Sequence, residues 1–363
     1  MRRSRVAIRA FLLCALLAAG ASAAQAHGLP GVGRLLDQLR YLTRALPSAA
    51  LAAESGQSAR SLALGILREY SPTGYYILDR FNNLPAQYIY GERLDFMEFI
   101  EGDRPTEVAA SLNTAVHEVC HAYTHAVALQ MLAQRAAKPA RGARYGAYYI
   151  GGEETILVQH TPVFAARETA GYFPEALRTF RFSTYISPSE ENLGTQVEGI
   201  YGLLGEFTAY YHGTKTAVEM IGFFKNETAQ APEDWFKYFA SVNGTFYSYL
   251  EFKLYILKYL QYARDKYPAI HRQILENREF KEAFLKIDRG FAETLRRYFA
   301  AKQEIQALLR SKGCDVSESD EYLWVTQGVK RVGQTNYMRV YNQLEQELRK
   351  PEYLEPVMAL GGP

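Results

Sequence analysis

The chain has 363 residues, of which 48% are hydrophobic and 22% charged, a composition that excludes a disordered chain and is typical of a globular protein. Its formal charge of +2 comes from four arginines near the N-terminus. Without residues 1–26 the chain has 37 basic and 39 acidic side chains, a formal charge of −2, so its bulk charge does not indicate nucleic-acid binding.

Residues 1–26 are predicted to be a secretory signal peptide. A basic stretch with Arg2, Arg3 and Arg5 precedes an apolar segment from Phe11 to Leu17, and small residues suited to cleavage follow at 21–26. No later apolar run approaches the ~20 residues of a membrane span. We therefore expect a mature chain that is exported, periplasmic or secreted, and has no membrane span.

The mature chain is expected to divide into an α+β part, residues 27–194, and a helical part, residues 195–363. In the first part we expect helices within 27–47 and over Ser61–Tyr70. Strand-like runs follow at Tyr75–Phe81, Gln87–Tyr90 and Leu94–Ile100. A long amphipathic helix is predicted from about Pro105 to Arg135, since it contains no glycine or internal proline. Residues 136–154 are expected to form a loop or irregular insertion.

The second part is predicted to be almost wholly helical. Phe246–Ala263 carries apolar side chains all round, which indicates a helix buried on more than one side. Further helices are expected over Ala269–Arg310 and Met338–Leu348, with a short apolar segment at Tyr322–Val325 between them.

The long helix carries the motif H-E-x-x-H at residues 117–121. His117 and His121 are four residues apart and therefore lie on one face of a helix, where one Zn²⁺ can bind both imidazoles. Glu118 can take the proton of a water that zinc has acidified. The alternative is a core helix whose histidines are only packed or hydrogen-bonded.

A catalytic zinc site needs a third protein ligand. Glu206 follows glycines 199, 202 and 205, which each weaken a helix by about 1 kcal/mol and suggest a face that another backbone, such as the zinc helix, approaches closely. The chain resembles the gluzincin-type zinc metallopeptidases over two segments, Val116–His125 and Leu203–Gly213. The resemblance lies in H-E-x-x-H followed downstream by Glu206, Ala209 and Tyr210. That resemblance implies a zincin-like catalytic core with Glu206 as the third ligand.

Four other residues are rival third ligands. Glu153 and Glu154 come soon after His121, but Gly151 and Gly152 precede them, and Glu198 lies just before the Glu206 segment. His125 is two turns from His117, about 12 Å along a straight helix and too far for the same metal.

The favoured interpretation is a zinc peptidase with one Zn²⁺ per chain and a peptide or protein substrate. Glu118 is the expected general base. The oxyanion of the reaction needs a stabiliser besides zinc. Four residues are candidates: Tyr210, Tyr211, His212 and His160. Of these, Tyr210 is the predicted catalytic residue. Asn113 is one of several residues that could orient the imidazoles.

Three alternatives remain open. The chain could bind zinc without catalysis, or it could be an all-helical binding protein with a chance motif. Cleavage after Ala26 would make His27 the first residue, which could chelate copper, although the secreted copper monooxygenases that do so resemble β-sandwiches. Cleavage of the signal peptide would leave two cysteines, Cys120 and Cys314. A disulfide between them is possible, but a buried free thiol at Cys120 is favoured.

Overall fold

The computed structural model describes residues 51–135 and 142–362, and their side chains from Ala59 on. The predicted signal peptide and the helix expected within 27–47 lie outside these residues. Residues 59–363 form one compact unit, and residues 1–58 form another, of which only the beginning of α3 is described. The boundary expected near residue 194 falls inside the larger unit.

The described chain is mainly helical, with 67% of its residues in helix, 12 helices and two small sheets. The first helices are α3 (Leu51–Tyr70), α4 (Pro72–Asn83) and α5 (Pro105–Ala133). The later helices are α6 (Gly194–Val197), α7 (Ile200–Glu219), α8 (Ile221–Asn226), α9 (Pro232–Asn243), α10 (Ser248–Lys266), α11 (Pro268–Glu276), α12 (Arg278–Ser311), α13 (Met338–Leu348) and α14 (Leu354–Ala359).

Both sheets are antiparallel. Strands β1 (Tyr145–Gly151) and β2 (Glu154–Gln159) form a hairpin in which Tyr148 pairs with Ile156. The second sheet has the order β3 (Asp315–Glu318), β4 (Tyr322–Gln327) and β5 (Lys330–Thr335). Leu323 and Val325 of β4 are buried, whereas the alternate residues of this strand are partly or largely exposed, as expected of a sheet covered on one face.

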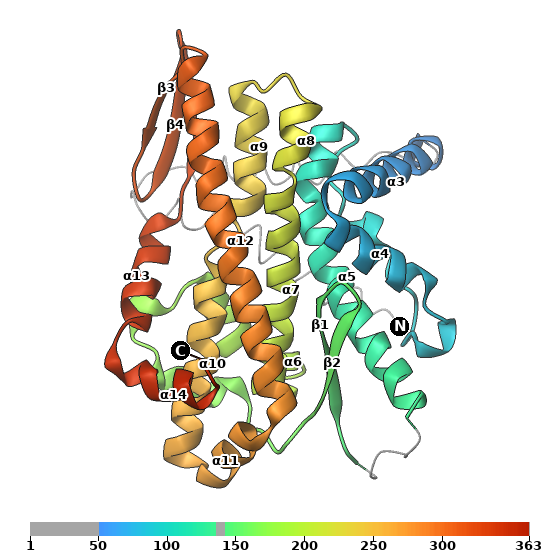
Figure 1. Cartoon of the computed structure of the whole chain (residues 1–363), viewed down its shortest axis with the longest axis vertical. Helices are drawn as coiled ribbons and strands as arrows, with labels where there is room; N and C mark the ends of the chain where they lie inside the picture. Colours follow the sequence, from blue (N-terminus) through green and yellow to red (C-terminus); the bar gives the residue numbers. More distant parts are fainter. Residues whose placement is uncertain (1–50, 136–141, 363) are drawn as a thin grey trace. The chain divides into compact units, whose positions relative to one another are not determined.

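Helix α7 is the element around which the others pack. It contacts α5, α10 and α12 extensively and also contacts α4, α9 and the β1 strand (Figure 1). It begins after Gly199, whose φ of 55° is left-handed, and a Cβ there would lie 2.6 Å from the carbonyl oxygen of Phe164. Only glycine fits this turn, so the sequence fixes where α7 starts.

The helices predicted from about Pro105 to Arg135 and over Met338–Leu348 are confirmed, since α5 covers Pro105–Ala133 and α13 covers Met338–Leu348. Burial of α10 on several sides is confirmed as well, because even Glu251, Lys258 and Gln261 are buried.

The strands expected before the zinc helix are wrong. Residues 75–81 belong to α4, where the Ser71 side chain accepts a hydrogen bond from the Gly74 N–H and Pro72 occupies the first turn. Gln87–Tyr90 overlaps a 3-10 turn at Ala86–Tyr88, and Leu94–Ile100 contains another at Phe96–Phe99. The irregular insertion expected over 136–154 instead supplies strand β1, so the β structure lies after α5 and not before it. The part expected to be almost wholly helical, residues 195–363, also contains the sheet β3–β4–β5.

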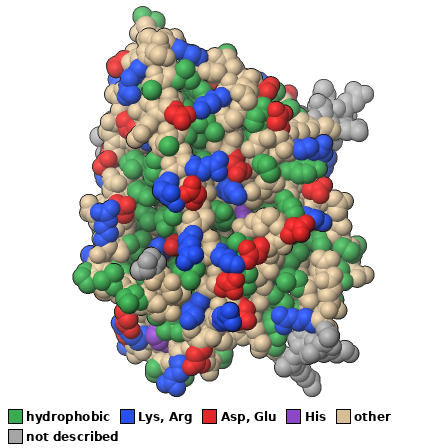
Figure 2. All heavy atoms as spheres, viewed as in Figure 1, with side chains coloured by type: hydrophobic (Ala, Val, Ile, Leu, Met, Phe, Trp, Pro, Cys, Tyr) green, Lys and Arg blue, Asp and Glu red, His purple; other side chains and the backbone are tan. Residues whose placement is uncertain are grey.

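The surface carries mixed charge on the face shown in Figure 2, where acidic side chains lie beside the basic ones. Lys286, for example, forms ion pairs with both Glu154 and Glu282. Such exposed pairs contribute little to stability.

Candidate metal centre

Helix α5 places the two imidazoles of the motif next to each other. The ring centroids of His117 and His121 are 5.0 Å apart, and the rings are inclined at 78°. His117 is buried and His121 is about one-third exposed. The pair therefore has one side in the protein interior and one side open to solvent.

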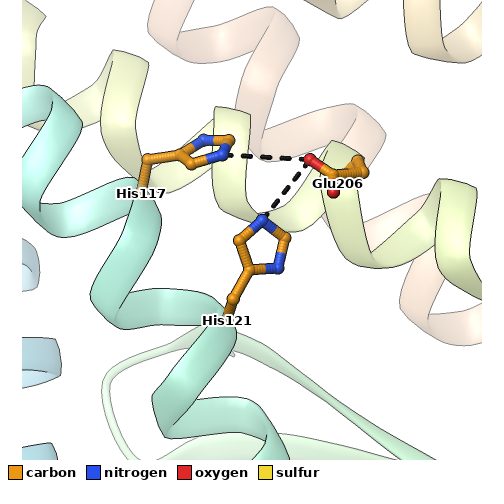
Figure 3. Close-up of side chains that lie close together, drawn as sticks. All are labelled: His117, His121 and Glu206. Carbon is orange, nitrogen blue, oxygen red and sulfur yellow. Dashed lines mark ion pairs between the residues drawn. The ribbon is translucent and has the colours of Figure 1, made fainter. Parts of the chain in front are cut away.

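Glu206 on α7 completes a cluster of three. Its Oε2 atom lies 3.8 Å from His117 Nε2 and 3.4 Å from His121 Nε2 (Figure 3). Each residue offers one ligand atom, and these atoms lie within 4.8 Å of one another, the one such group in residues 51–135 and 142–362. Two imidazoles and a carboxylate are a ligand set that Zn²⁺ favours at catalytic sites.

The buried oxygen of Glu206 is the best test of this fit. Oε2 is inaccessible to solvent and has no hydrogen-bond partner among the described residues. This buried oxygen faces the two imidazole nitrogens without accepting a well-aligned hydrogen bond, and a cation between the three side chains would compensate its charge. The residues present therefore fit a metal ion.

The two histidines differ in their affinity for protons. Burial lowers the pKa of His117 well below its usual value, with further lowering by His121 and Arg181. Burial also lowers the pKa of His121, but Glu206 and Glu118 outweigh it and raise that pKa to about 9. A metal must displace the proton of His121, so the affinity of the cluster for metal should decrease as the pH is lowered.

Glu118 lies beside the cluster with a pKa suited to proton transfer. Burial and the charge of Glu206 raise the pKa of its carboxyl group to about 7, although His121 lowers it. A carboxylate with a pKa near neutrality can both accept and return a proton. This matches the role expected of Glu118 from the motif.

Tyr210 is the candidate oxyanion stabiliser that contacts the cluster. Its ring centroid is 4.4 Å from that of His117, and its hydroxyl is 3.1 Å from the hydroxyl of Tyr185. Burial raises the pKa of Tyr210, although Arg181 opposes this, so the hydroxyl keeps its proton at neutral pH. Tyr185 lies in a π-helical turn, Phe182–Ile186, a type of turn often found at functional sites.

The other candidate stabilisers lie elsewhere. His160 stacks on Tyr201 at 4.2 Å, and burial lowers its pKa to about 4. His212 is fully buried, with Nε2 donating to the carbonyl oxygen of Tyr149 at 2.9 Å. Tyr211 packs against Phe291.

None of the rival ligands belongs to the three-residue cluster found in the described chain. Glu153 is at the hairpin turn, 89% exposed, and lies 3.9 Å from Arg80, while Glu154 pairs with Lys286. Glu198 follows α6, and His125 is exposed, with its ring 6.4 Å from that of Tyr90.

The close approach of α7 to α5 occurs at a glycine that the sequence did not single out. A Cβ at Gly213 would lie 2.9 Å from the carbonyl oxygen of Asn113, whereas a Cβ at Gly205 would meet nothing within 4 Å. Gly202 instead abuts Gly194 of α6. The prediction that glycines 199, 202 and 205 form a face in close contact with the helix of the H-E-x-x-H motif is therefore wrong.

Asn113 itself ties α5 to α9. Its side-chain amide donates to the carbonyl oxygen of Ser241 at 2.9 Å.

Cys120 and Cys314 are both buried and free.

Sequence reasoning missed Tyr185 and Arg181. Neither lies in a motif, and both contact Tyr210 through tertiary contacts that no local pattern reveals.

Comparison with known proteins gave no matching protein family, no similar curated protein and no similar solved structure. Among the described helices, none combines the length and the apolar character needed to cross a membrane.

Proposed function

We propose that this protein is an exported zinc-dependent hydrolase, a peptidase with a zincin-like core of the gluzincin type. The observation that supports it is the convergence of His117, His121 and Glu206, with a buried Glu206 oxygen that faces both imidazoles and accepts no well-aligned hydrogen bond. The export part rests on residues 1–26 of the sequence alone.

The three clustered side chains would hold the ion. Zinc, when bound, acidifies water and polarises a carbonyl oxygen. Glu118 would take the proton of the attacking water at its carboxylate and deliver it to the leaving amine, which its pKa of about 7 favours. Tyr210 would donate a hydrogen bond from its hydroxyl to the carbonyl oxygen as negative charge develops there.

An alternative without catalysis has one observation in its favour. Glu206 raises the pKa of His121 to about 9, so a protonated His121 can pair with Glu206 in the absence of metal. In that case the chain would be a mainly helical binding protein without a metal; binding of zinc without turnover is the other non-catalytic possibility.

Zinc content distinguishes these possibilities. We would measure zinc per chain by elemental analysis in the mature wild type, in Glu206→Ala and in the matched control Glu198→Ala, which removes the rival carboxylate. We expect about one zinc in the wild type and in Glu198→Ala, and a marked loss in Glu206→Ala. Zinc that is absent from all three after reconstitution would favour the binding protein without metal.

A peptide library then tests hydrolysis. Wild type loaded with zinc should cleave a subset of peptides, and cleavage should stop when a chelator removes the metal. Full zinc occupancy with no cleavage of any peptide would favour non-catalytic zinc binding.

A further inference from the structure

A buried cation lies next to the candidate metal centre. The side chains of Arg181 and Glu251 are 3% and 0% exposed and form an ion pair of 2.6 Å. Arg181 also donates to the carbonyl oxygen of Gly244. Burying an ion pair usually stabilises a protein no better than an apolar pair of similar size. The position of this pair therefore suggests a role other than stability.

The pair reaches the metal cluster through Tyr210. The guanidinium carbon of Arg181 lies 4.6 Å from the centroid of the Tyr210 ring, which packs in turn against the His117 ring. Arg181 also immediately precedes the π-helical turn that carries Tyr185, whose hydroxyl meets that of Tyr210. Contacts thus run without a gap from Glu251 to a candidate metal ligand.

The shape of the guanidinium makes it suitable for fixing a ring. It is planar, stacks on aromatic faces and can hold two acceptors at once. Glu251 and the Gly244 carbonyl hold Arg181 from the side, and the rings of Tyr210 and Tyr247 contact it at 4.6 and 4.8 Å. A guanidinium anchored in this way restricts rotation of the Tyr210 side chain.

We propose that Arg181 and Glu251 are positioning residues that hold the Tyr210 hydroxyl toward the metal cluster, where it donates to a ligand oxygen. This inference rests on the proposed function, because it assumes that metal and ligand bind at His117, His121 and Glu206. Arg181 acts through Tyr210 and does not itself touch the ligand.

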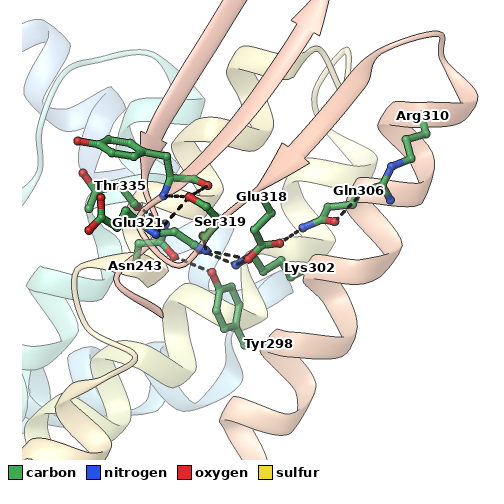
Figure 4. A network of polar contacts seen from close by, with 11 residues as sticks. Asn243, Tyr298, Lys302, Gln306, Arg310, Glu318, Ser319, Glu321 and Thr335 are labelled. Carbon is green, nitrogen blue, oxygen red and sulfur yellow. Dashed lines mark hydrogen bonds and ion pairs between the residues drawn. The ribbon is translucent and has the colours of Figure 1, made fainter. Parts of the chain in front are cut away.

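The chain offers a matched control. Lys302 is also a buried cation, with a side chain 6% exposed, and it pairs with Glu318 (Figure 4). Its other partner is Asn336, and this network joins α12 to the sheet β3–β4–β5. Replacing Lys302 and Glu318 by apolar residues should therefore perturb folding without changing Tyr210.

The test uses cobalt and acetohydroxamate, a metal-binding probe with oxygens that accept hydrogen bonds. Wild type and five variants of the mature protein are loaded with Co²⁺ and titrated with the probe, followed by visible absorption. The variants are R181M/E251L, R181K, Y210F, the triple variant R181M/E251L/Y210F and the control K302M/E318L. The paired apolar replacements avoid a buried charge without its partner. Thermal unfolding verifies that each variant folds.

We expect R181M/E251L and Y210F each to weaken probe binding about 10-fold or more, the effect of losing one hydrogen bond to a charged group. The triple variant should be no weaker than Y210F, since the pair acts through that tyrosine. R181K should recover only part of the affinity, because an ammonium cannot stack as a plane. The control should bind the probe within about 2-fold of wild type.

Two results would overturn the inference while leaving the metal site intact. One is unchanged probe affinity in cobalt-loaded R181M/E251L. The other is a triple variant whose loss of probe affinity equals the product of the fold-losses in R181M/E251L and Y210F. A wild type that binds no cobalt would instead overturn the proposed function, and this inference with it.

Discussion

Gly213 of α7 packs directly on His117 of α5, so closely that a Cβ at Gly213 would lie 3.2 Å from the Cβ of His117. Gly213 is seven residues, about two helical turns, from Glu206 on the same helix. The separation of α5 and α7 at this glycine therefore sets the distance between the histidine pair and the Glu206 carboxylate.

Gly213→Ala should push the two helices apart. The added Cβ would lie 2.9 Å from the carbonyl oxygen of Asn113, and this backbone atom cannot move aside as the end of a flexible side chain can. We expect a loss of about 1–3 kcal/mol in the free energy of unfolding and weaker zinc binding. Urea unfolding of the metal-free protein and competition with a chromophoric chelator measure the two effects.

Gly205→Ala is the matched control, because it adds the same methyl group beside Glu206 where nothing lies within 4 Å. It should raise the free energy of unfolding by up to about 1 kcal/mol through helix propensity and leave zinc binding unchanged. If both alanine variants behaved alike, the contact between Gly213 and His117 would not control the site.

Glu118→Gln should keep zinc and lose hydrolysis. The amide has nearly the same shape but cannot accept the proton, so we expect kcat to fall by about 10²–10⁴-fold on any peptide that the wild type cleaves. Glu107→Gln on the same helix is the control, since Glu107 pairs with Arg104 at the beginning of α5 and lies outside the cluster. Near-full activity in Glu118→Gln would exclude the carboxylate as the base.

The sequence predicted the elements whose signals are local and strong. Helix α5 carries an uninterrupted apolar periodicity after Pro105, and the pairing of His117 with His121 follows from helix geometry alone. Helix α4 carried the same kind of signal, since its buried residues Gly74, Ile77, Leu78 and Phe81 have helical spacing. It was misread as a strand because its tyrosine and isoleucine content favours strands.

The remaining site residues depend on tertiary contacts. Glu206 was predicted from a resemblance and a downstream position, and its distance from His121 is set by how α7 packs on α5. Arg181 and Glu251 are 70 residues apart and form a pair only because α10 lies beside the π-helical turn. Neither residue has neighbours in sequence that indicate this role.

Arg181→Met alone should destabilise the protein more than the double variant R181M/E251L. The single change leaves the Glu251 carboxylate fully buried without its cation, a situation that typically lowers the free energy of unfolding by about 3–5 kcal/mol. Replacing both residues removes the unpaired charge and should recover most of that loss. Urea unfolding measures both variants, and equal stability of the two would indicate that Glu251 finds another partner.

His212 should make the protein sensitive to acid. Burial lowers the pKa of this imidazole to about 3, so the folded chain keeps His212 neutral while the unfolded chain takes up a proton near pH 6.5. Stability from this group is therefore complete above pH 6.5 and is lost as the pH falls towards 3, by at most about 1.4 kcal/mol per pH unit. In His212→Gln, whose amide can still donate to Tyr149, the free energy of unfolding should fall less steeply than in the wild type. Urea unfolding with chelator present, at several pH values from 7.5 to 4, would reject this role if the two curves ran parallel.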